Sequence, residues 1–177
     1  AAIEPKAITA RSAANGTTLA SLPGTAFRER YKFPYRIIHR ADLQAALVAG
    51  CRRHEGVTLI TGATVTDTLA QGDGLLVRVT KGESHEVITA DGIVAADGVW
   101  SATRGTIAGS AGALSAGMTA WRATIAADVA RDLAAMDRVT LWLGPEGHVV
   151  HYPIARGAAL NVVAIVPETW DKPGWNA

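Results

Sequence analysis

Hydrophobic and polar positions along this chain change their period several times. Residues 63–69, 74–80 and 86–90 alternate apolar with polar side chains, and glycine-containing turns separate the three segments. A period of two is typical of strands that bury one face. This stretch therefore predicts a three-stranded antiparallel meander.

The pattern before and after the meander is different. Leu43, Ala46, Leu47 and Cys51 recur at three- and four-residue spacing, which predicts an amphipathic helix over residues 40–55. A short strand is expected at 57–60. Residues 92–96 are nearly all apolar, as in a strand that is covered on both faces. Together these elements indicate an α/β sheet with an antiparallel excursion.

The two ends of the chain predict more antiparallel structure. Segments 7–11 and 17–22 flank Asn15-Gly16, a pair that favours a hairpin with positive φ at both central residues, and irregular structure is expected over 26–35. The second half predicts a glycine-rich loop and hinge, one helix, and a mostly antiparallel sheet. In order, these elements are the loop at 108–117, a strand at 118–126, the helix at 128–136, and strands at 139–143, 148–153 and 159–166.

Composition excludes several classes of protein. The chain has 49% hydrophobic residues, 19% charged residues and a formal net charge of +1, with no cluster of lysine and arginine, so it offers no electrostatic argument for binding nucleic acid or a membrane. Its one cysteine, Cys51, fits a reducing cytoplasm, and its apolar surroundings favour a packed thiol. The sequence shows no signal peptide, and its ends suggest part of a larger protein.

Several well-known site patterns are missing from the sequence. There is no Gly-x-Gly-x-x-Gly loop, no Walker-type loop and no zinc-ligand spacing, so no metal site is expected. Ser101 lacks the Gly-x-Ser-x-Gly surroundings of a hydrolase nucleophile.

Asp97-Gly98 is the most informative pair in the chain. It follows the apolar segment 92–96 and precedes a predicted helix that carries Ser101 and Arg104. Ligands of open α/β sheets bind beyond the carboxyl ends of strands, where an aspartate can reach a ligand hydroxyl and a glycine lets the backbone come close. The alternative is an ordinary Asp-Gly turn.

Three stretches in order resemble one family. Residues 35–44 resemble the His-Arg-x-x-Leu segment of flavin-dependent aromatic hydroxylases, residues 94–104 their Asp-Gly motif, and residues 141–154 their substrate-domain hairpin. The last is most similar to the salicylate hydroxylase and 6-hydroxynicotinate 3-monooxygenase branch. Ala95 replaces the usual glycine of the Asp-Gly motif.

The resemblance implies the para-hydroxybenzoate hydroxylase fold. That means part of a Rossmann-like FAD domain with a meander excursion, plus a mostly antiparallel substrate domain. The implied division is a substrate-domain hairpin at 1–36, a partial FAD domain at 37–110 and a partial substrate domain at 111–177. It also implies hydroxylation of a small phenol-like aromatic substrate with FAD, NAD(P)H and O2. Family members are longer at both ends, so this chain is expected to be inactive alone.

The resemblance also assigns roles to residues. Arg40, Gln44, Asp97, Gly98 and Arg104 would bind the cofactor. The alternative for Arg40 is a solvated arginine in the first helical turn, and Gln44 and Arg104 could equally be surface residues. A guanidinium at a helix start can hold a pyrophosphate.

Further candidates lie on the later strands. His148 and Tyr152 are four apart on one predicted strand and so share a face. His148 would transfer a proton, and Tyr152 would hydrogen-bond the substrate. His151 falls on the opposite face. Arg122, next to Trp121, could bind a substrate carboxylate. Sheet packing is the alternative for all of these, and packing is expected for Trp142, Trp170 and Trp175.

Two other functions remain open at this point. One is a non-catalytic ligand-binding or interaction module on a flavoprotein scaffold. The other is a flavin-dependent dehydrogenase of the same fold.

Overall fold

The computed structural model describes residues 2–108 and 112–168, and their contacts form two compact units. The first unit holds residues 2–53 and 116–168, and the second holds residues 54–108 and 112–115. Each unit contains its own β-sheet. Trp170, Trp175 and positions 109–111 of the predicted loop lie outside the described residues. The predicted three-part domain division stays a prediction.

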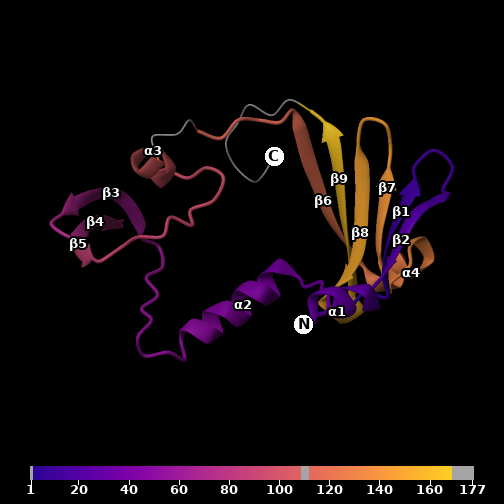
Figure 1. Cartoon of the computed structure of the whole chain (residues 1–177), viewed down its shortest axis with the longest axis horizontal. Coiled ribbons are helices and arrows are strands. Elements are labelled where there is room, and N and C mark those ends of the chain that lie inside the picture. Colours follow the sequence, from indigo (N-terminus) through magenta and orange to yellow (C-terminus); the bar gives the residue numbers. More distant parts are fainter. Residues whose placement is uncertain (1, 109–111, 169–177) are drawn as a thin grey trace. The chain divides into compact units, whose positions relative to one another are not determined.

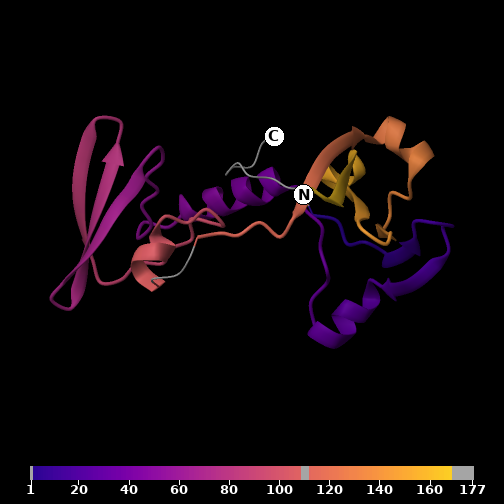
Figure 2. The ribbon, with the colours of Figure 1, turned by 90° about the horizontal axis from the view of Figure 1, so that it is seen from above.

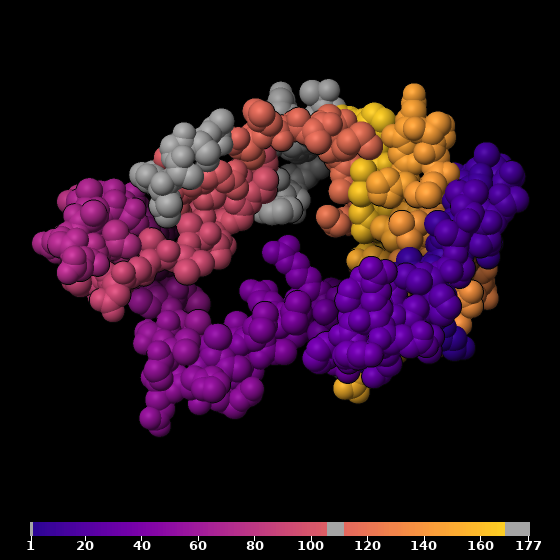
Figure 3. Space-filling model, in the orientation of Figure 1, coloured from indigo at the N-terminus to yellow at the C-terminus, as the bar shows by residue number. Residues whose placement is uncertain are grey.

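The first unit is built on a six-stranded sheet with the order β2-β1-β7-β8-β9-β6 (Figure 1). Its strands are β1 (Ala7–Ser12), β2 (Thr18–Pro23), β6 (Met118–Ala126), β7 (Val139–Leu143), β8 (His148–Ile154) and β9 (Ala159–Pro167). The predicted strands and their antiparallel pairing are confirmed. One pair was not foreseen: β1 runs parallel to β7. The N-terminal hairpin therefore extends the later sheet, and its indigo atoms lie beside the orange atoms of the later strands (Figure 3).

The predicted hairpin between β1 and β2 is confirmed, but its turn differs. Gly16 has φ of +73°, whereas Asn15 keeps a negative φ, contrary to prediction. The backbone N–H of Ser12 donates to the carbonyl of Thr17, so the loop is longer than two residues. Asn15 Oδ1 accepts hydrogen bonds from Thr17 N (3.1 Å) and Thr17 Oγ1 (2.8 Å). Its side chain thus stabilises the turn from a negative φ.

Helix α1 (Thr25–Tyr31) covers residues 26–31 of the segment predicted to be irregular, so the prediction is wrong there, whereas residues 32–35 form neither helix nor strand, as predicted. Phe27 and Tyr31, one turn apart, have ring centroids 6.3 Å apart, and Phe27 also lies 5.0 Å from the ring of Tyr35. These aromatic contacts stabilise a helix that propensity alone does not favour.

Two further helices belong to this unit. Helix α2 (Arg40–Cys51) confirms the predicted helix, which ends four residues earlier than expected. Its predicted apolar face is not covered: Leu43 and Leu47 are 44% and 61% exposed. Helix α4 (Ala127–Leu133) matches the predicted helix at 128–136, and Ala130 is fully buried. A short 3₁₀ turn, η1 (Ala155–Gly157), joins β8 to β9.

The main core of the first unit lies on one face of the sheet. Ile37, Val139 and Ile154 are at most 6% exposed, and five partly buried residues pack against them: Ile8, Leu141, Val150, Tyr152 and Ala159. We call this face the Ile37 face. We call the opposite face, which carries buried Thr9, Thr140, His151 and Pro153, the His151 face.

Ile37 is fixed by an isolated bridge to Ile3. Glu4 also accepts hydrogen bonds from Arg28 and Arg36, but these groups are exposed, and such ion pairs contribute little to stability. Burial of Ile37 therefore stabilises this part of the unit more than the ion pairs do, since it removes a whole aliphatic side chain from water.

The second unit contains the predicted meander, which is confirmed. Strands β3 (Thr64–Gln71), β4 (Gly74–Lys81) and β5 (Ser84–Ala90) form a twisted antiparallel sheet (Figure 2). Val77 and Val79 on the central strand are buried. Helix α3 (Thr103–Ala108) follows the Asp-Gly pair, as predicted.

Two predicted strands of this unit are absent. Residues 57–60 and 92–96 are not strands, and Val94 is 91% exposed where a doubly covered strand was expected. Within the described residues, neither segment pairs with another strand. A parallel strand forms only beside a hydrogen-bonding neighbour, so an apolar sequence alone leaves the segment extended but unpaired.

Candidate functional site

The carboxylate of Asp97 is the centre of a local hydrogen-bond network in the second unit. It accepts hydrogen bonds from Ser101 Oγ (2.6 Å), from Thr103 Oγ1 (2.6 Å) and from the backbone N–H of Thr103 (3.2 Å). The hydroxyl of Ser101 in turn accepts a hydrogen bond from the backbone N–H of Arg104 (3.0 Å). The start of α3 therefore holds the carboxylate in one place.

The backbone beside Asp97 is fixed from the other side by Arg104. Its guanidinium donates to the carbonyl of Val99 (3.2 Å) and to that of Gly98 (3.1 Å). Gly98 has φ of +82°, which other residues rarely adopt, and a Cβ built there would meet nothing within 4 Å. Glycine is thus required by the conformation, and the open space leaves the backbone accessible.

These contacts also set the charge of the site. Hydrogen bonds from Ser101 and then Thr103 hold the pKa of Asp97 well below its usual range, because they stabilise the ionised form. Asp97 is exposed, so it presents a fixed anion that accepts hydrogen bonds from a ligand. Ser101 and Thr103 had no assigned role in the sequence; their spacing of four and six residues after the aspartate was the available signal.

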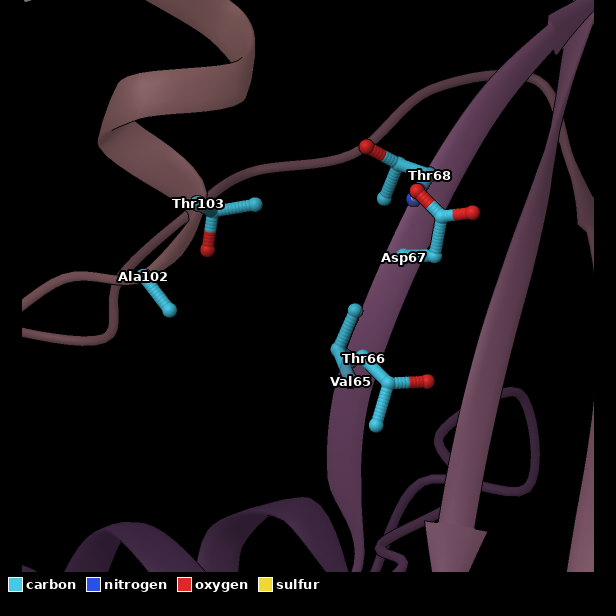
Figure 4. A pocket seen from close by; sticks show the side chains of 6 residues that line it. All are labelled: Val65, Thr66, Asp67, Thr68, Ala102 and Thr103. Atoms are coloured by element: carbon cyan, nitrogen blue, oxygen red, sulfur yellow. Dashed lines mark hydrogen bonds between the residues drawn. The ribbon is translucent and has the colours of Figure 1, made fainter.

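A small pocket lies between β3 and the start of α3 (Figure 4). Val65, Thr66, Asp67 and Thr68 line it from the strand, and Ala102 and Thr103 from the other side. Its volume of about 80 Å³ is far below the range of roughly 300–1,000 Å³ that is typical of ligand pockets. It has room for waters beside Thr103, but not for an aromatic substrate.

A second group of candidates lies on the Ile37 face of the six-stranded sheet. Val150 pairs with Val163, and Val163 pairs with Arg122. Residues opposite each other in a sheet share a face, and so do residues two apart on one strand. Arg122, His148 and Tyr152 therefore share one face, as predicted for the two β8 residues. His148 and Tyr152 are half-buried, and Arg122 is exposed.

The register adds two polar neighbours that sequence reasoning missed. Asn161 pairs with Tyr152, and Thr124 pairs with Asn161. No local motif marks either residue, since only the pairing of β6, β8 and β9 brings them together. The Ile37 face thus combines a phenol, an imidazole, an amide and a guanidinium beside aliphatic side chains. These side chains offer hydrogen-bond donors and acceptors and one cation.

Arg40 and Gln44 occupy the first two turns of α2, one turn apart on the same side of the helix. Both side chains are exposed. The helix begins three residues after Ile37, which is buried in the core of the first unit. A basic group at this position remains available for an anionic ligand.

The neighbouring candidates lie elsewhere. His151 lies on the face opposite His148 and Tyr152, as predicted, and is 8% exposed. Trp121 alternates with Arg122 and so faces away from it; Trp121 Nε1 donates to Glu168 Oε2 (3.0 Å). Cys51 is a half-buried free thiol.

The described part of the chain holds no cluster of histidine, cysteine and acidic residues that could bind a metal ion. No helix within it is long and apolar enough to cross a membrane.

Comparison with characterised sequences identifies the class of protein. The chain is 38% identical over 160 residues to 3-amino-4-hydroxybenzoate 2-monooxygenase PtnB3 of Streptomyces platensis, covering 87% of this chain and 37% of that protein. It is 34% identical over 158 residues to 3-hydroxybenzoate 6-hydroxylase of Klebsiella oxytoca, covering 88% and 38%. No family model matches the chain.

Solved structures agree on the fold. A salicylate hydroxylase in complex with its substrate has a TM-score of 0.69 at 23% identity, covering 99% of this chain and 44% of that one. HpxO of Klebsiella pneumoniae, complexed with FAD and uric acid, has a TM-score of 0.74 at 24% identity, covering 97% and 42%.

The chain is therefore homologous to FAD-dependent monooxygenases and hydroxylases of the 3-hydroxybenzoate hydroxylase type, and the resemblance to aromatic hydroxylases noted in the sequence is confirmed. It spans about two fifths of the length of these relatives. The α/β class is also confirmed: a six-stranded mixed sheet and a three-stranded meander match part of the para-hydroxybenzoate hydroxylase fold.

Proposed function

We propose that this chain forms the central part of an FAD-dependent monooxygenase. The enzyme hydroxylates a small phenol-like aromatic compound and uses NAD(P)H and O2. The single observation that carries this proposal is the homology to hydroxybenzoate hydroxylases. The placement of Arg122, His148 and Tyr152 on one sheet face supports it.

The residues present suit an FAD molecule. Asp97 offers an ionised carboxylate that can accept hydrogen bonds from ribityl or ribose hydroxyls, and Gly98 leaves open space beside its backbone. Arg40 and Gln44, in the first unit, would bind a phosphate or ring edge of FAD, because a guanidinium binds phosphate oxygens in pairs. Arg104 supports the loop by holding its carbonyls. When bound, FAD supplies the electron transfer from NAD(P)H to O2.

The sheet face supplies substrate binding. Tyr152 would hydrogen-bond the substrate hydroxyl, and His148 would take up its proton, which makes the ring more reactive towards an electrophilic oxygen. Arg122 would hold the substrate carboxylate. The name of each of the two curated relatives includes a hydroxybenzoate, and an arginine is well suited to a carboxylate of this kind.

The unpaired apolar segments 57–60 and 92–96 fit the same proposal. In the longer relatives, parts outside the matched region would supply neighbouring strands and cover Val94. We therefore expect the 177-residue chain alone to bind FAD weakly and to be inactive. Titration with FAD, followed by the flavin fluorescence and visible spectrum, measures this; tight stoichiometric binding would contradict it.

The test of function uses a longer protein that carries this chain. With FAD bound, it should oxidise NAD(P)H and hydroxylate hydroxybenzoates. Arg122→Gln should raise KM at least tenfold for substrates with a carboxylate, but not for phenols without one. Trp121→Phe, one residue away on the opposite face, is the matched control. FAD binding with substrate oxidation but no hydroxylated product would favour a dehydrogenase. Ligand binding without turnover would favour a non-catalytic module.

A further inference from the structure

The His151 face contains a buried polar row that the proposed function does not use. Thr9, Thr140 and His151 are in register across β1, β7 and β8. Their exposed fractions are 4%, 4% and 8%. Buried polar groups are costly unless they are hydrogen-bonded, so the partners of each group matter.

The imidazole of His151 has one such partner. Trp142 Nε1–H donates to His151 Nε2 at 3.0 Å, across the β7–β8 pair. An indole nitrogen can only donate, so Nε2 must carry a lone pair, and the ring proton of the neutral imidazole must lie on Nδ1. His151 Nδ1 is buried and has no hydrogen-bond partner among the described residues.

We propose that Trp142 and His151 form an acid-sensitive latch between β7 and β8, closed when the imidazole is neutral and opened when it takes up a proton. Protonation adds a hydrogen to Nε2, which then faces the N–H of Trp142. Two donors cannot bond to each other, so the ring must turn away or the strands must separate. Either change loses the contact and leaves a buried cation.

The charges around the latch act in the same direction. The Arg11 guanidinium lies 5.6 Å from the centre of the Trp142 ring, and a second cation beside it is unfavourable. None of the six strands of the sheet contains an aspartate or glutamate. The carboxylate of Glu168, which follows β9, accepts a hydrogen bond from Trp121. The charged residues of α4, Asp128, Arg131 and Asp132, are exposed. Burial lowers the pKa of His151.

The sign of the pH dependence follows from this direction. The unfolded chain takes up a proton on His151 near pH 6.5, whereas the folded chain does so at lower pH. The latch therefore stabilises the fold above about pH 6.5. Below it, the folding equilibrium constant should fall by up to tenfold per pH unit, until the folded state is also protonated.

The most direct test is nitrogen NMR of the histidine rings in the full 177-residue chain. At neutral pH, His151 should show a proton on Nδ1 and an accepting Nε2, and it should titrate below the ordinary range of a histidine. Trp142→Phe removes the donor and should raise the titration midpoint of His151. A charged imidazole at neutral pH, the opposite tautomer, or an unshifted midpoint in Trp142→Phe would overturn the proposal.

Urea unfolding between pH 5 and 8, followed by hydrogen exchange in β7 and β8, gives the second readout. His151→Gln keeps an acceptor but cannot titrate, so it should remove the loss of stability in acid. His148→Gln, on the same strand but the opposite face, is the matched control and should keep that loss. Equal pH profiles in the two variants would contradict the latch.

Discussion

Apolar side chains of similar type are buried in the six-stranded sheet but exposed in the segments that flank the smaller sheet. In β9, Leu160 and Val163 are 2% and 5% exposed. In the second unit, Val94 is 91% exposed, and Val57, Leu59 and Ile60 are each more than 40% exposed. Both regions have strand-like sequences, yet only the first finds its partners within the described chain.

The difference shows which part of the fold is self-sufficient. Antiparallel strands joined by short loops pair with near neighbours in the sequence, as β7, β8 and β9 do. Parallel strands of a Rossmann-like sheet need partners that are distant in the sequence. The relatives are more than twice as long as the region that they share with this chain.

The largest expected effect tests the buried sheet. Leu160→Ala should lower the free energy of unfolding by about 2–5 kcal/mol, because it removes buried methyl groups and leaves a cavity. Leu114→Ala is the matched control, since Leu114 is 90% exposed, and should change stability by less than about 0.5 kcal/mol. Urea denaturation of both variants measures the contrast. Equal losses would show that the two regions are not different in packing.

A second substitution tests whether the exposed strand-like segment is completed in a longer protein. Val94→Ala should leave the 177-residue chain unchanged within about 0.5 kcal/mol. In a longer protein that covers this segment, it should cost about 2 kcal/mol, since burying a valine contributes about that much. Thermal unfolding of the two lengths in parallel gives the comparison. A similar small effect in both would mean that Val94 stays exposed.

A third change concerns the backbone at the Asp-Gly pair. Gly98→Ala should destabilise the second unit by about 1 kcal/mol, because alanine at a φ of +82° is strained although space is free around it. Gly92→Ala, where φ is not positive and space is equally open, should have little effect. Hydrogen exchange within the meander and α3 reports both variants. No difference between them would contradict the strain.

The smallest effect is a shift in the titration of Asp97. Replacing its hydroxyl partners with Ser101→Ala and Thr103→Val should raise the pKa of Asp97 towards its ordinary value. The depressed pKa contributes stability above the pKa of the unfolded chain, and this is lost as pH falls through that of the folded chain. Carboxyl carbon NMR follows the titration. Thr103→Ser, which keeps a hydroxyl, should shift it less than Thr103→Val.

Sequence periodicity predicted those elements whose partners lie close by. The meander and strands β6 to β9 follow a period of two, and their turns contain glycine, so local rules suffice. Helix α1 was missed because contacts of Phe27 with Tyr31 and Tyr35 stabilise it. The parallel pairing of β1 with β7 was missed because no local pattern specifies pairing between distant segments.

The candidate site, like the fold, was predictable from the sequence only where its residues lie close together along the chain. Asp97, Gly98 and Arg104 form one motif, and their mutual support follows from short spacing. His148 and Tyr152 share a face because four residues separate them on a strand. Asn161 and Thr124 become their neighbours only through the register of β8, β9 and β6. The tautomer of His151 depends on Trp142, nine residues away, through a hydrogen bond that no spacing rule specifies.

The central claim is that this sheet face binds an aromatic substrate for hydroxylation by a flavoprotein. The most direct measurement supplies isotope-labelled O2, NAD(P)H and a hydroxybenzoate to a longer FAD-loaded protein that carries this chain, and weighs the product by mass spectrometry. The account predicts one labelled oxygen atom on the ring, and much less product with Tyr152→Phe. Unlabelled product, or label that is independent of Tyr152, would contradict it.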